Sequence, residues 1–98
     1  MPLGRILLAD DEQDLLDVLS EFLEDEGYQV VTANDGVAAL EILARDSRFD
    51  LLLSDINMPR MKGFELISES RKRYPAVKCG LITAYEDFEQ RGEPAWKQ

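Results

Sequence analysis

Residues 5–11 read Arg-Ile-Leu-Leu-Ala-Asp-Asp, a short apolar run that ends in two aspartates. Leu51–Ser54 leads into Asp55 in the same way, and Gly80–Ile82 leads into Thr83. Short continuous apolar runs are typical of strands that are buried on both faces of a parallel sheet. Ligands of such sheets bind just beyond the carboxyl ends of the strands. We therefore expect the three carboxylates and the hydroxyl to gather at one edge of a sheet.

Amphipathic segments separate these runs. Apolar residues of segment 14–26 recur at helical spacing, with Asp14 as the predicted N-cap and Gly27 as the residue that ends the helix. Asn34 or Asp35 is expected to cap the next helix. The predicted elements are strand 5–9, helix 14–26, strand 28–32, helix 37–45, strand 51–54, helix 64–73 and strand 77–83. Alternating strands and helices predict an α/β fold with a parallel sheet and right-handed crossovers.

The composition fits one globular domain of 98 residues, with 45% hydrophobic and 32% charged residues. A net charge of −9 argues against direct binding to nucleic acid, which requires clustered Lys and Arg. No apolar stretch reaches membrane-spanning length and the N-terminus lacks a signal-peptide pattern, so we expect a cytoplasmic protein without membrane contact. Without histidine, the chain cannot carry Ser-His-Asp or Cys-His catalysis or the common zinc sites.

The expected edge cluster has the composition of a phosphoryl-transfer site. A carboxylate such as Asp55 can attack phosphorus, but only where a cation neutralises the anionic group. Asp10 and Asp11 could hold Mg²⁺, which prefers carboxylates, waters and phosphate oxygens. The Thr83 hydroxyl could donate a hydrogen bond to a phosphoryl oxygen. Each residue taken alone also has a simpler explanation as a turn, cap or strand residue.

Three segments resemble the receiver domain of two-component response regulators. They are Ile6–Glu12 with its acidic pair, Asp55–Gly63 with the pattern Asp-x-x-Met-Pro-x-Met-x-Gly, and Leu81–Ala84. The resemblance covers residues 5–84 and implies a flavodoxin-like, doubly wound, three-layer fold. Its parallel sheet would have the family's strand order 2-1-3-4-5, here truncated to the first four strands.

The same resemblance assigns roles to the residues. It implies that Asp55 accepts a phosphoryl group from a phosphohistidine on a sensor histidine kinase or phosphotransfer protein. Asp10, Asp11 and Asp55 would hold Mg²⁺, with the backbone carbonyl of Asn57 as a further ligand. Thr83 would be the switch hydroxyl that relays the phosphorylated state.

The chain departs from this family after its fourth strand. Receivers of this type continue with a strand that carries a lysine and with a last helix, whereas residues 85–98 contain no strand-like run and Lys97 lies in an unsuitable context. We therefore predict a receiver domain over residues 1–84 and a divergent tail over residues 85–98. An uncovered strand 77–83 would expose unpaired backbone groups, so we expect this edge to be covered by self-association with another copy, by a partner, or by Tyr85, Phe88 and Trp96 folding back.

Three functions remain open at this point. The leading one is a phosphoacceptor signalling domain that turns over no independent substrate. A degenerate receiver that binds partners without phosphorylation is favoured by the missing lysine. A magnesium-dependent phosphohydrolase would also use an aspartyl phosphate, but would require a substrate-covering cap that these residues do not supply.

Overall fold

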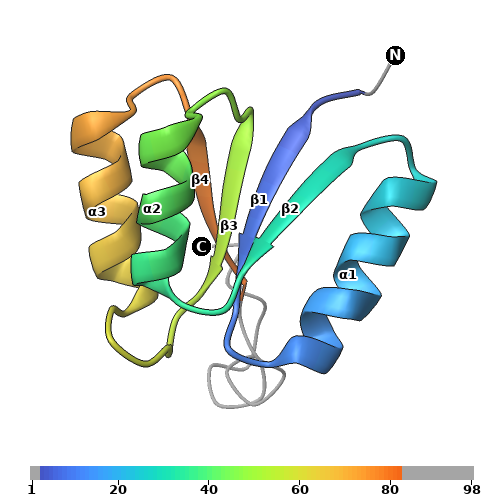
Figure 1. The fold of residues 1–98 in the computed structure, drawn as a ribbon, viewed down its shortest axis with the longest axis horizontal. Helices are drawn as coiled ribbons and strands as arrows, with labels where there is room; N and C mark the ends of the chain where they lie inside the picture. Colours follow the sequence, from blue (N-terminus) through green and yellow to red (C-terminus); the bar gives the residue numbers. More distant parts are fainter. Residues whose placement is uncertain (1–2, 83–98) are drawn as a thin grey trace, which may run out of the picture.

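A computed structural model describes residues 3–82 as alternating strands and helices. The elements are β1 (Arg5–Ala9), α1 (Gln13–Asp25), β2 (Gln29–Ala33), α2 (Gly36–Arg45), β3 (Leu51–Asp55), α3 (Gly63–Arg73) and β4 (Lys78–Ile82). All strand pairs are parallel, and the order in the sheet is β2-β1-β3-β4. Figure 1 shows α1 on one side of this sheet and α2 with α3 on the other, which gives three layers. The predicted α/β architecture, element order and strand order are thus confirmed.

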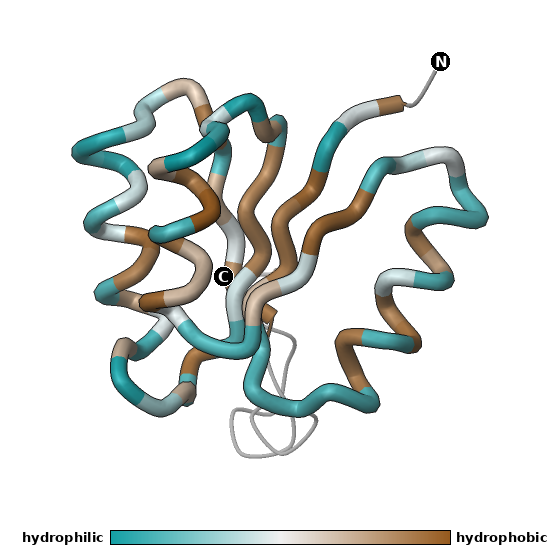
Figure 2. Tube along the Cα trace, in the orientation of Figure 1, coloured by the Kyte–Doolittle hydropathy of each residue, from teal (hydrophilic) through white to brown (hydrophobic). Residues whose placement is uncertain are grey.

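The alternation of side chains along the strands divides the core between the two faces of the sheet. On β1, Leu7 and Ala9 belong to the cluster packed by α2 and α3, whereas Ile6 and Leu8 face the cluster packed by Leu16 of α1. Figure 2 shows the corresponding apolar strands at the centre, between helices whose outer faces are hydrophilic. β1 is therefore buried on both faces, as its continuous apolar run predicts. On β3, Leu52 is fully buried on the side of α2 and α3, whereas Leu51 and Leu53 on the other side are half-buried.

The helix ends follow the predicted chemistry at most positions but not at the start of α1. Asp14 is not the N-cap: α1 begins at Gln13, and Glu12 occupies the N-cap position without a side-chain hydrogen bond. Asp35 does cap α2, because its side chain accepts the N–H of Ala38. Gly27 follows α1 with a φ of 107°, a left-handed conformation that glycine adopts at little cost.

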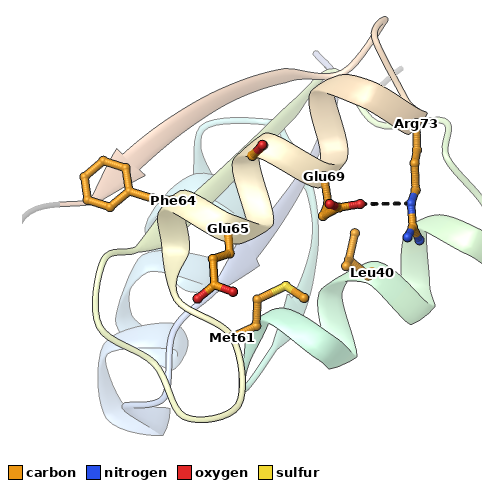
Figure 3. Close-up of a pocket in the computed structure, with 7 residues that line it drawn as sticks. Leu40, Met61, Phe64, Glu65, Glu69 and Arg73 are labelled. Atoms are coloured by element: carbon orange, nitrogen blue, oxygen red, sulfur yellow. Dashed lines mark ion pairs between the residues drawn. The ribbon is translucent and has the colours of Figure 1, made fainter.

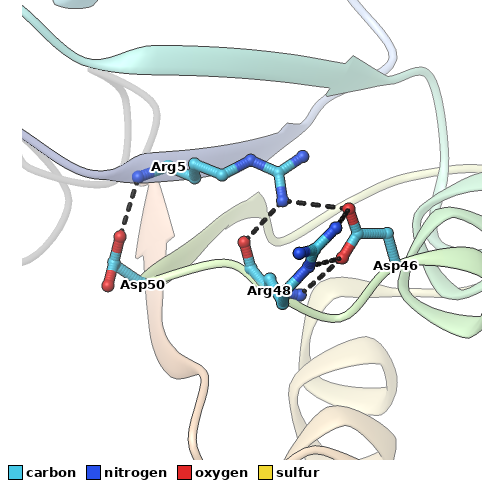
Figure 4. Close-up of polar contacts among 4 residues, drawn as sticks. All are labelled: Arg5, Asp46, Arg48 and Asp50. Carbon is cyan, nitrogen blue, oxygen red and sulfur yellow. Dashed lines mark hydrogen bonds and ion pairs between the residues drawn. The ribbon is translucent and has the colours of Figure 1, made fainter. Parts of the chain in front are cut away.

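A polar cluster ties the beginnings of β1 and β3 together, at the end of the sheet opposite the carboxyl ends (Figure 4). The Arg5 N–H donates to Asp50 Oδ2 at 2.8 Å, and the Arg5 guanidinium donates to the carbonyl of Arg48 at 2.7 Å. The guanidinium carbon of Arg5 also lies over the Phe49 ring, 4.4 Å from the ring centroid. Asp46 accepts from both arginines, and the Arg48 side chain and N–H are the main reasons why its pKa lies well below the usual range. These contacts join the beginnings of β1 and β3 and lie away from the carboxyl ends of the strands.

Within residues 3–82, β4 is hydrogen-bonded only to β3 and forms one edge of the sheet. The predicted self-association through this edge remains a prediction. No helix in the described part of the chain is long and apolar enough to cross a membrane.

Candidate metal and phosphoryl-transfer site

Two neighbouring strands bring the predicted carboxylates together. Ala9 of β1 is in register with Ser54 of β3, so the residues that follow them, Asp10 and Asp55, emerge side by side at the carboxyl edge. Asp10, Asp11 and Asp55 each offer an oxygen, and these three oxygens lie within 4.8 Å of one another. Separations of this size allow a single cation to contact all three carboxylates.

The three carboxylates differ in their exposure to solvent. Asp10 is only 1% exposed, Asp55 is half-buried and Asp11 is exposed. The backbone of Asp10 is held at the end of β2, because its N–H donates to the Ala33 carbonyl at 3.1 Å. The cluster therefore has a buried floor and one side open to solvent.

Backbone donors orient one oxygen on each of the two less exposed carboxylates. Asp10 Oδ1 accepts the N–H of Glu12 at 2.9 Å, and this bond turns the chain into α1. Asp55 Oδ1 accepts the N–H of Ile56 at 2.9 Å. The side chains are therefore fixed before any ligand binds, which lowers the cost of ordering them around a cation.

The electrostatics of the cluster favour a bound cation. Burial is the main cause that raises the pKa of Asp10, and the Asp11 charge adds to it, while the Glu12 N–H acts in the opposite direction. Burial also raises the pKa of Asp55 most, followed by the charge of Asp10, with further contributions from Asp11 and Glu12. The ionised cluster is thus under mutual repulsion, which a divalent cation would relieve.

The donor set fits Mg²⁺ better than a softer metal. All three side chains are hard oxygen donors, and one open side leaves room for the waters and phosphate oxygens that Mg²⁺ usually retains. Neither histidine nor cysteine belongs to this cluster. The described residues are therefore suited to Mg²⁺.

Three further residues considered in the sequence, Asn57, Thr83 and Lys97, lie outside the carboxylate cluster or outside the described residues. Asn57 lies exposed in the loop between β3 and α3, next to the cluster in sequence. Thr83 and Lys97 lie outside the described residues. The roles of Asn57 and Thr83 accordingly remain predictions.

Sequence reasoning missed two contacts that shape this loop. A Cβ atom on Gly63 would overlap the Asp55 carbonyl oxygen, so only glycine allows α3 to start against the end of β3. Arg60 forms an ion pair with Asp35, the N-cap of α2, with a shortest distance of 2.8 Å. The glycine of the motif hinted at the first contact, whereas nothing local in the sequence links two residues 25 positions apart.

A hollow on the described surface lies apart from this cluster. A groove of about 440 Å³ runs between α2 and α3, lined by Leu40, Met61, Phe64, Glu65, Ser68, Glu69 and Arg73 (Figure 3). Two of its lining residues, Arg73 and Glu69, form an ion pair at 3.2 Å. No member of the acidic cluster lines it, so the groove is separate from the candidate site.

Comparison with protein families gives one match that covers most of the chain. The model of the response regulator receiver domain matches residues 6–95. Curated relatives include a response regulator receiver protein from Anaeromyxobacter sp., 44% identical over 83% of this chain and 34% of the relative. The response regulator protein FleR from Pseudomonas aeruginosa is 41% identical over 84% of this chain and 17% of its own length. The chain thus spans about a third or less of these two relatives.

Solved structures agree with this match in fold and sequence. The chemotaxis response regulator CheY4 of Vibrio cholerae is 35% identical, with a TM-score of 0.78 over 91% of this chain and 75% of that protein. The response regulator TrrA of Thermotoga maritima, solved in complex with Mg²⁺ and BeF, is 38% identical. Its TM-score is 0.79, with coverage of 92% of this chain and 76% of that protein.

Proposed function

The chain belongs to the response regulator receiver domain family of two-component systems, and from this premise we propose that Asp55 is its phosphoacceptor. The observation that carries the proposal is the convergence of Asp10, Asp11 and Asp55, whose ligand oxygens lie within 4.8 Å of one another. Asp55 alone of the three is both partly accessible and the last residue of a strand. It can therefore reach an incoming phosphoryl group while its backbone stays fixed in the sheet.

The proposed reaction is a transfer between a partner and Asp55. A carboxylate oxygen of Asp55 attacks phosphorus, a new O–P bond forms, and the N–P bond of the donor phosphohistidine breaks with its electron pair going to the imidazole. These 98 residues contain no histidine, and we propose that a sensor histidine kinase or phosphotransfer protein supplies the phosphohistidine. The Ile56 N–H orients Oδ1 of Asp55, which leaves the rest of the carboxylate for the transfer. We expect no turnover of an independent substrate.

We further propose that Asp10, Asp11, Asp55 and the Asn57 backbone carbonyl hold Mg²⁺. Bound there, Mg²⁺ would neutralise the charge that builds up between the carboxylates and the phosphoryl oxygens. Asp10 is buried and would hold the ion from the floor of the site, whereas Asp11 is exposed and would hold it from the solvent side. Thr83, which follows β4, would respond to the phosphoryl group through its hydroxyl and relay the state.

Intact mass spectrometry tests the acceptor role directly. The protein is incubated with Mg²⁺ and acetyl phosphate, and in parallel with EDTA in place of Mg²⁺. We expect one phosphoryl adduct in the presence of Mg²⁺, absent in Asp55→Asn and absent with EDTA. Asp50→Asn is a matched control, because Asp50 precedes the same strand but lies at its opposite end.

The possible outcomes separate the candidate functions. An adduct that survives in Asp55→Asn would show that another residue is the acceptor. No adduct under any condition would favour a degenerate receiver that acts only through protein contacts. Continuous release of phosphate from added phosphate esters would favour a phosphohydrolase.

A further inference from the structure

The loop that joins β3 to α3 is closed at its base. The Gly63 N–H donates to the Ile56 carbonyl at 2.9 Å, and the first residue of α3 packs directly on the Asp55 carbonyl. Asn57 lies inside this closed loop, one residue after Ile56. Its backbone therefore depends on how the rest of the loop is held.

The tip of the loop contains a tight turn with an unusual residue at its centre. The Met61 N–H donates to the Pro59 carbonyl at 2.8 Å, which closes a turn of three residues around Arg60. Arg60 has a φ of 69°, and it is the one non-glycine residue with positive φ in the described part of the chain. Turns of this kind are rare and strained, and glycine would adopt this conformation at lower cost. Such a conformation persists where contacts with the surrounding structure offset its cost.

The Arg60 side chain fastens the turn to the beginning of α2. Its Nε donates to Asp35 Oδ2 at 2.9 Å and its Nη2 donates to Asp35 Oδ1 at 3.0 Å, a two-pronged contact. The Asp35 side chain is only 13% exposed, and its Oδ1 also accepts the Ala38 N–H at 2.8 Å. Asp35 is thus a rigid anchor, because the helix backbone fixes it before Arg60 binds.

A second contact beside this pair keeps the turn on α2. A Cβ on Gly36 would lie 2.8 and 2.9 Å from Cβ and Cγ of Met61, so glycine is required for the methionine to pack there. Two consecutive loop residues, Arg60 and Met61, therefore contact two consecutive residues at the start of α2. The loop has a fixed base on β3 and a fixed tip on α2.

We propose that Arg60 is a positioning residue which, through Asp35, holds the loop so that the Asn57 carbonyl is presented to the cation site. This inference rests on the proposed function, in which that carbonyl is a Mg²⁺ ligand. Groups that orient metal ligands without touching the metal typically change affinity by 10- to 100-fold when they are removed. Because only one ligand among several is affected, we expect the lower end of that range, about tenfold.

Arg60→Gly is the most informative variant. Glycine accepts the left-handed backbone, so the turn itself is not penalised, while the contact with Asp35 is lost. Asp35→Asn is the second variant, because the amide oxygen can still accept the Ala38 N–H but the charge that holds Arg60 is gone. Arg48→Gly is the matched control, since it removes an arginine paired with an aspartate at the opposite end of the sheet.

The readouts are the Mg²⁺ dissociation constant from isothermal titration calorimetry, well below the unfolding transition, and the urea midpoint without Mg²⁺. We expect Mg²⁺ to bind about tenfold more weakly to Arg60→Gly and Asp35→Asn, no further loss in the double variant, and no change in Arg48→Gly. A pair that only stabilised the fold would lower the urea midpoint and leave the Mg²⁺ affinity intact, and that result would overturn the inference.

Measurements on the wild-type protein separate a failure of the proposed function from a failure of the positioning role. If it does not bind Mg²⁺, the proposed function fails and this inference falls with it. If it binds Mg²⁺ but forms no adduct with acetyl phosphate, the acceptor role fails. Weaker Mg²⁺ binding by Arg60→Gly would still support the positioning role in that case.

Discussion

Asp10→Asn should stabilise the protein in the absence of Mg²⁺, although Asp10 is almost fully buried and central to the acidic cluster. The amide oxygen can still accept the Glu12 N–H that Asp10 Oδ1 accepts now. What the substitution removes is one of three charges whose oxygens lie within 4.8 Å of one another. At that distance two unit charges repel by about 3.5 kcal/mol at an effective dielectric constant of about 20, and by about 0.9 kcal/mol in water.

The partners of Asp10 are partly or largely solvated, so the gain falls in the lower part of this range. We expect the free energy of unfolding to rise by about 1–2 kcal/mol at pH 7, which raises Tm by roughly 5–15 °C in a chain of this size. Mg²⁺ should raise the Tm of the wild-type protein but not that of the variant. The measurement is thermal unfolding by circular dichroism with EDTA and with Mg²⁺.

The pH dependence gives a second check on the same reasoning. Burial and the Asp11 charge raise the pKa of Asp10 in the folded state, so the folded protein binds this proton more tightly than the unfolded chain does. The penalty is present at neutral pH and disappears as the pH falls through the raised pKa towards 3.8. The stability difference between Asp10→Asn and wild type should therefore shrink between pH 7 and pH 4.

A control of opposite sign makes the result decisive. Asp46 is a carboxylate held by Arg5 and Arg48, so Asp46→Asn should lower the stability at pH 7. If Asp10→Asn is as stable as wild type or less stable in EDTA, while Asp46→Asn behaves as expected, repulsion within the cluster is not the dominant force and the reasoning is refuted.

Three further predictions concern the fold around the site. Gly63→Ala should lose about 1–3 kcal/mol or more in urea unfolding, because its Cβ would overlap the Asp55 carbonyl, and an unaltered midpoint would contradict the close approach. Leu16→Ala should cost about 2–5 kcal/mol, whereas Val18→Ala on the exposed side of the same helix should change the midpoint by less than about 0.5 kcal/mol. The pKa of Asp46 is lowered in the folded state, so its ionised form stabilises the fold above the unfolded pKa of about 3.8. Wild type should therefore lose stability more steeply than Asp46→Asn as the pH falls below this value. Acid titrations followed by circular dichroism that run in parallel for the two proteins would argue against a stabilising contact between Asp46 and Arg48.

The sequence predicted the sheet well because each strand carries its own signal. A continuous apolar run such as Ile6–Leu8 requires burial on both faces, and a sheet covered on both sides provides it. The carboxyl-end cluster follows from the same rule, since parallel strands end at one edge. The limits of individual elements shifted by about one residue, and Asp14 gave way to Glu12 as the N-cap, because several residues near this helix start can take that position.

The part of the site that could not be predicted depends on contacts between distant segments. The left-handed Arg60 and its partner Asp35 lie in different loops, and each has an ordinary local interpretation as a turn residue and a helix cap. Gly63 was visible as part of a motif, but the reason for it is a backbone contact with Asp55 that only the three-dimensional packing reveals. Local propensity thus identifies the strands, and tertiary contacts determine the loop between them.

The hydrophobic cores on the two faces of the sheet differ in size, and this difference affects which helix unfolds locally first. In the described part of the chain, ten buried apolar residues belong to the cluster on the side of α2 and α3, and three belong to the cluster on the side of α1. The thinner layer should open first in local unfolding, so amide protons of α1 should exchange with solvent faster than those of α3. Asp10 and Asp11 lead directly into α1. A cation bound to the acidic cluster should therefore slow hydrogen exchange in α1 more than in α3. The exchange rate of α1 would then report whether the site is occupied.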